Sequence, residues 1–248
     1  MTVVAPAKLT LSLRITGVRD DGYHLIDAEM VSLDLVDTLT FDDGDGLTAD
    51  GPFAAGVPLD ERNLVSKALR AVGRRAAVHV HKAIPHGGGL GGGSADAAAV
   101  LRWAGVTDLE RAAALGADVP FCLVGGRARV GGIGEVVEPL PLRAMDITLV
   151  IPPLQVSTPA AYRAWDELGG PTGRDVNDLE AAALVVEPRL AEWKRRIETA
   201  CGRDATLAGS GATWFVIGHH RQLVDELADG TVVFARTADA EGRALEAP

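Results

Sequence analysis

The chain has 248 residues, 47% of them hydrophobic, which is enough to bury one large core or two modest ones. Its 24 basic and 34 acidic residues give a formal net charge of −10, which argues against a general surface for nucleic acid or for anionic membranes. The two cysteines, Cys122 and Cys201, lie far apart and form no CxxC pattern, so the sequence predicts neither a disulfide framework nor a zinc knuckle.

The first predicted elements are strands. Polar and apolar residues alternate from Leu9 to Ile15, which is typical of a strand with one buried face. A turn is expected over 19–23, and the pattern from His24 to Phe41 again favours strands. The glycine and aspartate residues over 42–46 predict a hairpin turn.

A helix and a strand lead to the most distinctive stretch of the chain. Asn63 is typical of an N-cap before an amphipathic helix that runs from Leu64 to Val72, and residues 77–81 alternate like another strand. Six of the eight residues over 87–94 are glycines, and an alanine-rich helix follows. Such a loop lets backbone amides approach a ligand, and the helix adds the positive end of its dipole. The stretch therefore predicts a phosphate cradle. Its residues are Gly87, Gly88, Gly89, Leu90, Gly91, Gly92, Gly93 and Ser94.

Three alternatives remain for this loop. A P-loop that starts at Gly87 or Gly88 would lack the lysine that the motif requires. Gly87, Gly89 and Gly92 fit the dinucleotide pattern G-x-G-x-x-G, but this match is weak without a regular βαβ crossover. The third alternative is a surface loop without a ligand, although flexible linkers seldom stand between a strand and an alanine-rich helix.

The second half of the chain predicts a mixture of helices and strands. Strands are expected at 147–151, 213–217 and 232–235. Helices are expected to open at Ser157 and Asn177. This order suits an α+β sandwich with helices on one side of an antiparallel sheet.

Several motifs follow one another along the chain. They are Pro6-Ala7-Lys8-Leu9, Gly22-Tyr23-His24, the glycine loop with Ser94, Leu115-Gly116-Ala117-Asp118-Val119-Pro120-Phe121, Asn177-Asp178-Leu179-Glu180 and Gly209-Ser210-Gly211-Ala212-Thr213. In this order the chain resembles the small-molecule kinases of the GHMP superfamily. The resemblance implies an α+β, two-domain GHMP kinase fold, with an N-terminal α/β sandwich over 1–143 and a C-terminal ferredoxin-like antiparallel α/β sandwich over 144–248. ATP and the substrate would meet in the cleft between these domains.

Two residues are candidates for catalysis. A kinase needs positioning and charge neutralisation more than covalent help. Asp118 stands among apolar neighbours, where aspartate is an odd choice for packing, and Lys8 stands in an apolar strand, where an ammonium needs an anionic partner. The resemblance implies that Asp118 is the catalytic acid or base and that Lys8 partners Asp118 or the transferred phosphate. On local sequence alone, Asp118 could be a helix N-cap and Lys8 an edge residue that reaches solvent.

The cofactors that the resemblance implies are ATP and Mg²⁺, and no residue is assigned as a metal ligand. The hydroxyl of Ser94 can cap the helix or meet a phosphate or Mg²⁺. Asp96, in the expected first turn of that helix, is predicted to be structural because a carboxylate there complements the dipole. The resemblance places Lys82 and Asn63 on the adenine side of the site, although each could also be a surface residue or a cap.

The resemblance assigns five residues to the substrate. Tyr23 and His24 stand in a polar turn, where a flat ring and a ring nitrogen can stack on a cytosine and bond to it. Without the resemblance, the ring could simply cover the hairpin and the histidine could start a strand. Thr158 and Tyr162 are four residues apart, so they share a helix face, and they match positions near the cytidine. Thr10 stands near the substrate where the family usually has asparagine, and a hydroxyl supplies one donor where an amide supplies two.

The leading hypothesis is a kinase that phosphorylates the 2-hydroxyl of a cytidine-diphosphate-linked methylerythritol for isoprenoid synthesis. The alternatives are another GHMP kinase, acting on homoserine or a mevalonate-like alcohol, and a catalytically silent ligand-binding protein on the same fold.

The expected partner is the small-molecule substrate, without nucleic acid or membrane, and the chain is expected to be a monomer or a homodimer. No signal region or long apolar run is seen, which favours a cytoplasmic protein. The remaining histidines are expected to be structural or exposed. They are His79, His81, His86, His219 and His220.

Overall fold

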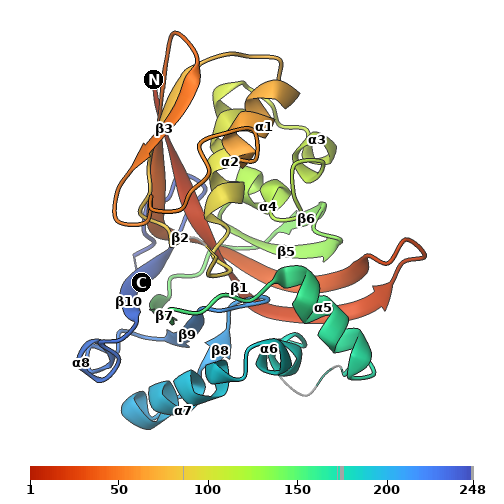
Figure 1. Cartoon of the computed structure of the whole chain (residues 1–248), viewed down its shortest axis with the longest axis vertical. Helices are drawn as coiled ribbons and strands as arrows, with labels where there is room; N and C mark the ends of the chain where they lie inside the picture. The colour runs from red at the N-terminus through yellow and green to blue at the C-terminus, as the bar shows by residue number, and fades with distance from the viewer. Residues whose placement is uncertain (86, 172, 174–175, 247–248) are drawn as a thin grey trace.

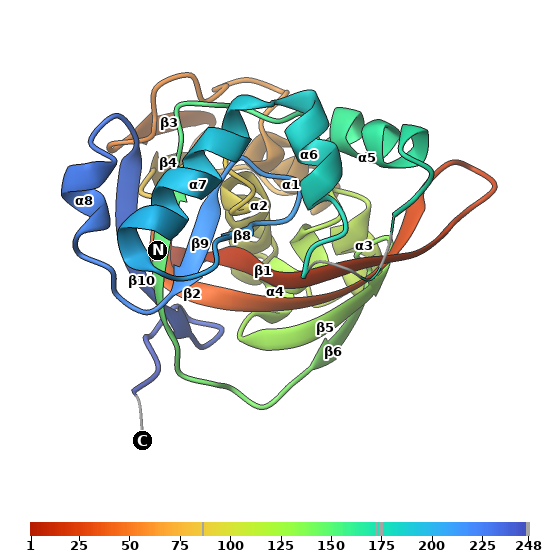
Figure 2. The same ribbon diagram turned by 90° about the horizontal axis from the view of Figure 1, so that it is seen from below.

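The computed structural model of the chain describes residues 1–85, 87–171, 173 and 176–246. Its longest feature is an antiparallel ribbon of two strands, β1 (Thr2–Val18) and β2 (His24–Asp42), joined by the predicted turn. The middle of β1 is buried on both faces, from Ala5 to Thr10. The tip of the ribbon lies beside α5 (Thr158–Glu167), as Figures 1 and 2 both show.

β2 organises the sheet. β1 lines one edge of β2 over nearly its whole length, and other strands follow one another along the opposite edge. These are β5 (Arg127–Gly132), β10 (Thr231–Ala238) and β4 (Ala77–His81). Two short strands extend the sheet, β6 (Val136–Pro139) beside β5 and β3 (Gly46–Asp50) parallel to β4.

The hairpin predicted at 42–46 is wrong. The chain turns there, but the strand that follows, β3, pairs with β4, and β4 lies between β3 and β2. Val78 and Val80 of β4 are each only 2% exposed, whereas the residues of β3 are half-buried or exposed. The more apolar strand therefore takes the inner position, and the more exposed strand is left at the edge of the sheet.

Helices of the first half cover one face of the sheet (Figure 1). They are α1 (Leu64–Ala71), α2 (Gly92–Trp103), α3 (Leu109–Ala113) and α4 (Val119–Val124). α2 packs on β1 and touches both α1 and α4. Its buried face is built of small side chains, the alanines from Ala95 to Ala99, which let the helix approach the strand closely. This packing brings the glycine loop, at the start of α2, next to β1.

The second half adds a further layer of strands and helices. β7 (Asp146–Ile151) lies between β10 and β9 (Trp214–Ile217), and β8 (Thr206–Leu207) lies beyond β9. Helices pack against these strands around a second apolar cluster that contains Trp193 and Trp214. They are α6 (Glu180–Val186), α7 (Arg189–Cys201) and α8 (Leu223–Glu226), and Figure 2 shows α7 lying over β9.

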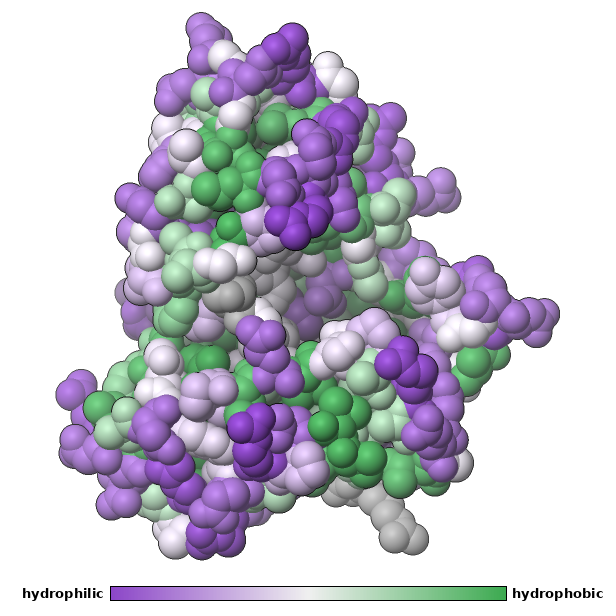
Figure 3. Space-filling view, viewed as in Figure 1, coloured by the Kyte–Doolittle hydropathy of each residue, from purple (hydrophilic) through white to green (hydrophobic). Residues whose placement is uncertain are grey.

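β10 joins the two halves, because it pairs with β7 over most of its length and with β2 through Thr237 and Ala238. The predicted α+β class is confirmed, and the division at 143/144 stays a prediction. The space-filling view shows that the surface is hollowed between the part that carries α1 and α2 and the part that carries α5 to α7 (Figure 3). Among the helices of the described ranges, none has the length and apolar character needed to cross a membrane.

Candidate active site

Lys8 lies at the centre of the site. Its side chain is only 6% exposed, and its Nζ lies 3.3 Å from Oδ2 of Asp118. The same ammonium donates a hydrogen bond of 3.2 Å to Oγ1 of Thr10. The prediction that Lys8 needs an anionic partner is therefore confirmed, and the solvent-reaching alternative is wrong. Thr10 is buried and its hydroxyl accepts a hydrogen bond from Lys8, and a contact between Thr10 and the substrate stays a prediction.

Asp118 occupies the N-cap position of α4, but its side chain makes no capping hydrogen bond. Its backbone is in the helical region, with φ −87° and ψ −11°, whereas capping residues usually have an extended backbone. The carboxylate faces Lys8 instead and is 33% exposed, so it can meet a molecule from solvent. The capping alternative is therefore wrong.

The glycine loop reaches β1 directly, since N of Lys8 donates to O of Leu90 at 3.0 Å. Gly91 is the N-cap of α2, with a left-handed φ of 68° and no side-chain capping bond. The helix thus begins at Gly92, and Ser94 is its third residue, so the prediction that Ser94 caps the helix is wrong. The amides of the first turn have no carbonyl one turn earlier to pair with, which leaves them available to an anion.

A second glycine-rich loop, over 209–213, packs against the first. A Cβ built on Gly89 would lie 2.5 Å from O of Ala208, and one built on Gly88 would lie 2.6 Å from Oγ1 of Thr213. Glycine is therefore required for the two loops to touch. Thr213 is fully buried, and its Oγ1 has no hydrogen-bond partner among the residues that the structure describes. The two loops together surround one side of Lys8.

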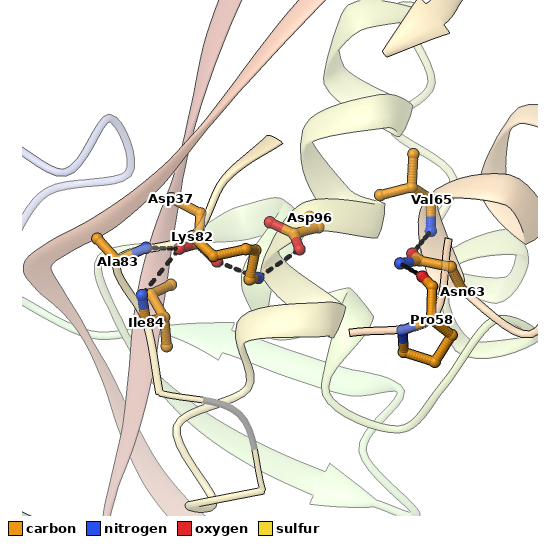
Figure 4. A network of polar contacts seen from close by, with 8 residues as sticks. All are labelled: Asp37, Pro58, Asn63, Val65, Lys82, Ala83, Ile84 and Asp96. Atoms are coloured by element: carbon orange, nitrogen blue, oxygen red, sulfur yellow. Dashed lines mark hydrogen bonds and ion pairs between the residues drawn. The ribbon is translucent and has the colours of Figure 1, made fainter. Parts of the chain in front are cut away.

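Beneath the first loop lies a buried group of charges, which Figure 4 shows from close by. The ammonium of Lys82 pairs with Oδ2 of Asp37 and, at 2.6 Å, with Oδ2 of Asp96. Oδ1 of Asp37 accepts hydrogen bonds from N of Ala83 at 2.6 Å and from N of Ile84 at 2.8 Å. The group joins β2 to both ends of the glycine loop, because Lys82 precedes the loop and Asp96 follows it.

This placement corrects two predictions. The side chain of Lys82 is 4% exposed and is enclosed by two carboxylates, which argues against a direct contact with adenine. Asp96 is structural, as predicted, but it lies beyond the first turn of α2 and binds Lys82. Asn63 caps α1: its Oδ1 accepts from N of Val65 at 2.8 Å. Its Nδ2 is also used locally, so a contact between Asn63 and adenine stays a prediction.

The buried charges have a consequence for stability. Burial raises the pKa of Asp96 to about 7; the ammonium of Lys82 opposes this and the charge of Asp37 adds to it. Between about pH 4 and pH 7 the unfolded chain has lost this proton while the folded chain keeps it. As the pH rises through this range, Asp96 therefore lowers the free energy of unfolding by up to about 1.4 kcal/mol per pH unit. Asp96→Asn should remove this dependence of the unfolding free energy on pH. Urea unfolding at pH 5 and pH 7 measures the dependence in both proteins. An equal change with pH in the two proteins would contradict a protonated Asp96.

The predicted substrate residues meet around α5. Nε2 of His24 lies 2.8 Å from Oδ1 of Asp166, and the ring of His24 lies 4.7 Å from that of Tyr162 between centroids. Trp165 closes the other side of His24 edge-on, at 5.5 Å. Tyr23, at the tip of the ribbon, is 59% exposed. His24 is thus held by α5, whereas Tyr23 is free to move onto a ligand.

The same helix also lies near Asp118 and the second glycine loop. Burial, with a smaller contribution from the charge of Asp118, raises the pKa of Tyr162 to about 12. Oγ1 of Thr158 lies 2.8 Å from Oγ of Ser210. α5 therefore contacts the second glycine loop through Thr158 and His24 through Tyr162. That these residues form one substrate site stays a prediction.

Several of these contacts could not be predicted from the sequence. Asp37, Asp166 and Ser210 are polar residues in ordinary surroundings, and only the fold shows that each binds a predicted site residue. Both cysteines are free thiols. Within the described ranges, no three or more His, Cys, Asp or Glu side chains are grouped to hold a metal, and His86 lies outside those ranges.

Comparison with known proteins identifies the family. Residues 63–126 match the model of the GHMP kinases N terminal domain. A 4-diphosphocytidyl-2-C-methyl-D-erythritol kinase of Paracoccus denitrificans is 41% identical over 231 residues, covering 85% of this chain and 84% of that protein. The chain belongs to the 4-diphosphocytidyl-2-C-methyl-D-erythritol kinase family. The glycine loop lies within the segment that matches this family model.

Other relatives agree with this assignment. A 4-diphosphocytidyl-2-C-methyl-D-erythritol kinase of Ruegeria pomeroyi is 41% identical over 242 residues and covers 85% of this chain and 86% of its own. A crystal structure of 4-(cytidine 5'-diphospho)-2C-methyl-D-erythritol kinase superposes with a TM-score of 0.77 at 32% identity, over 95% of this chain and 98% of the other. A homoserine kinase from Cytophaga hutchinsonii superposes with a TM-score of 0.57 at 18% identity, over 96% of each chain, and shows only the shared fold.

Proposed function

We propose that this member of the 4-diphosphocytidyl-2-C-methyl-D-erythritol kinase family transfers the γ-phosphoryl group of ATP to the 2-hydroxyl of 4-diphosphocytidyl-2-C-methyl-D-erythritol. The products are the 2-phosphate and ADP, and the step belongs to non-mevalonate isoprenoid synthesis. Besides the family, one observation supports the proposal: the buried ammonium of Lys8 lies 3.3 Å from the part-exposed carboxylate of Asp118, beside two glycine loops. This pair can act on the acceptor hydroxyl as it attacks the γ-phosphate of an ATP whose phosphates lie at the start of α2.

Each group has a distinct task. Asp118 accepts the proton of the attacking hydroxyl, and Lys8 compensates negative charge on the transferred phosphoryl group. The free amides at the start of α2 hold the other phosphates of ATP. Mg²⁺ would neutralise phosphate charge. Mg²⁺ in such sites is commonly bound by the phosphates and by few protein ligands, so the hydroxyl of Ser94 would be the one ligand that this loop supplies.

A coupled ADP-release assay tests the proposal. The alcohols are the cytidyl substrate, its uridyl analogue, 2-C-methyl-D-erythritol 4-phosphate, homoserine and mevalonate. ADP release that is fastest with the cytidyl substrate supports the proposal. Preference for homoserine or mevalonate would favour another GHMP kinase, and ligand binding without ADP release would favour a silent binding protein.

The exposed ring of Tyr23 gives a specificity prediction. If it stacks on cytosine, Tyr23→Ala should lose about 1–3 kcal/mol of substrate binding, whereas Tyr23→Phe should keep most of it because the ring face does the stacking. Calorimetry with the cytidyl substrate and with ATP measures both effects, and ATP affinity should stay the same. A Tyr23→Phe variant as weak as Tyr23→Ala would show that stacking is not the interaction.

His24 plays a supporting part in this proposal. One ring nitrogen is held by Asp166, so the other nitrogen is the one available to the base.

We further propose that the two domains divide at 143/144, that the enzyme is cytoplasmic, and that it works as a monomer or a homodimer. Gel filtration against standards distinguishes the last two states.

A further inference from the structure

The motif Asn177-Asp178 is buried beside the site but does not face the substrate. Asn177 is 2% exposed and Asp178 is 5% exposed. Asn177 does not cap α6, because the helix begins at Glu180 with Leu179 in the cap position. Its Oδ1 accepts a hydrogen bond of 2.9 Å from N of Leu179, which closes a local turn. A turn alone does not explain why a buried amide is present here.

The other end of this amide binds the second glycine loop. Nδ2 of Asn177 donates to O of Leu207 at 2.9 Å and to O of Gly209 at 2.6 Å. An amide nitrogen carries two hydrogens, so both donors of Asn177 hold this one segment. An aspartate of the same shape would place an acceptor against two carbonyl oxygens, and an alanine would leave them without this partner.

The segment that Asn177 holds lies against the catalytic lysine. Gly209 has a left-handed φ of 62°, and a Cβ built on it would lie 3.8 Å from Nζ of Lys8 and 3.6 Å from Oγ1 of Thr10. The backbone of Gly209 therefore forms part of the wall around the ammonium. A shift of this backbone by a fraction of an ångström would alter where Lys8 can lie.

Asp178 fixes the segment that contains Asn177 to β1, the strand that carries Lys8. N of Asp178 donates to O of Leu13 at 3.0 Å, and Oδ2 of Asp178 accepts from N of Ile15 at 2.8 Å. Leu13 also donates to O of Val176 at 3.0 Å. Residues 176–178 thus bind β1 on one side and, through Asn177, the loop at Gly209 on the other. The two segments beside the ammonium are joined through this motif.

We propose that Asn177 is a positioning residue for phosphoryl transfer, which holds Gly209 against Lys8 and thereby fixes the Lys8 ammonium opposite Asp118. The proposal rests on the proposed kinase function. The bonds of Asn177 end on Leu207 and Gly209, and the atoms nearest to a Cβ built on Gly209 belong to Thr10 and Lys8, so we expect a larger effect on the step that uses Lys8 than on ATP binding.

Steady-state kinetics of Asn177→Ala test this. We expect kcat to fall about 10- to 100-fold, as for a displacement of a catalytic group, while KM for ATP changes less than about twofold. The matched control is Thr148→Val, which removes a buried hydroxyl that donates to O of Gly218 at 2.7 Å and accepts from N of His220. It should lower the melting temperature with kcat unchanged. A kcat for Asn177→Ala equal to that of the control would overturn the proposal.

A second measurement does not depend on activity. Hydrogen exchange of the amides over 207–213 should become faster in Asn177→Ala than in the unmodified protein, while exchange in α1 stays the same. An unmodified protein that releases no ADP, combined with faster exchange in the variant, would count against the kinase function and leave the contact standing. An active unmodified protein with the same exchange and kcat in the variant would remove the positioning role alone.

Discussion

Asp118→Ala is expected to lower kcat about 10²- to 10⁴-fold, the range that a general acid or base contributes. The physical reason is that the carboxylate lies beside Lys8 yet is one-third exposed, so it can take a proton from a hydroxyl brought from solvent. Lys8→Ala should give a loss of similar size, because no described side chain other than Lys8 brings an ammonium to this carboxylate within ion-pair distance. Single-turnover assays with the cytidyl substrate measure both losses.

ATP affinity separates a catalytic effect from a folding effect in these variants. The first amides of α2, which we propose to hold the phosphates, do not depend on Asp118, so calorimetry should give nearly unchanged ATP affinity in Asp118→Ala. The control is Asp27→Asn, which removes a carboxylate whose Oδ1 lies 2.7 Å from Nε of Arg129, outside the site. This control should keep full activity. Near-normal turnover in both Asp118→Ala and Lys8→Ala would refute their assigned roles.

The contact between Lys8 and Asp118 could be predicted because each residue breaks a local pattern. A lysine in an apolar strand and an aspartate among apolar neighbours both need a partner, and the resemblance suggested that they partner each other. The glycine loop was predictable for a similar reason, since a run of glycines before a helix has few other uses. What the sequence could not provide was distance: the contact between Lys8 and Asp118 joins residues far apart in the chain, and it depends on α2 and α4 packing on β1.

The errors also have physical causes. The resemblance placed Lys82 on the adenine side of the site, but two carboxylates from β2 and α2 enclose its ammonium and compete for it more effectively than a neutral base can. Asp37, one of those carboxylates, lies in a strand whose alternation hides it among ordinary polar positions. The prediction of a hairpin at 42–46 was wrong because turn residues predict a turn but do not predict which strand will pair with β2, and β4 takes that place.

Gly91→Ala is expected to lower kcat on the order of 100-fold, the loss typical of a catalytic group displaced by about 1 Å. The added Cβ would lie 2.6 Å from Cγ of Lys8, which is closer than atoms can approach, and the buried side chain of Lys8 has little space to move away. The glycine loop was predicted as a cradle for phosphate, yet Gly91 is glycine because Lys8 passes directly over it.

Backbone strain must be separated from this contact, since Gly91 has a left-handed φ of 68° that alanine also disfavours. Gly73 provides the matched control, because its φ is 65° and a Cβ built on it would meet nothing within 4 Å. Gly73→Ala should lose about 1–2 kcal/mol of unfolding free energy through strain and keep its kcat. Gly91→Ala should lose at least as much stability, measured by urea unfolding, because the overlap with Lys8 adds to the strain, and it should also lose its kcat. If the two variants keep equal kcat, the close approach of Lys8 to the loop has no role in catalysis, and the loop acts on phosphate alone.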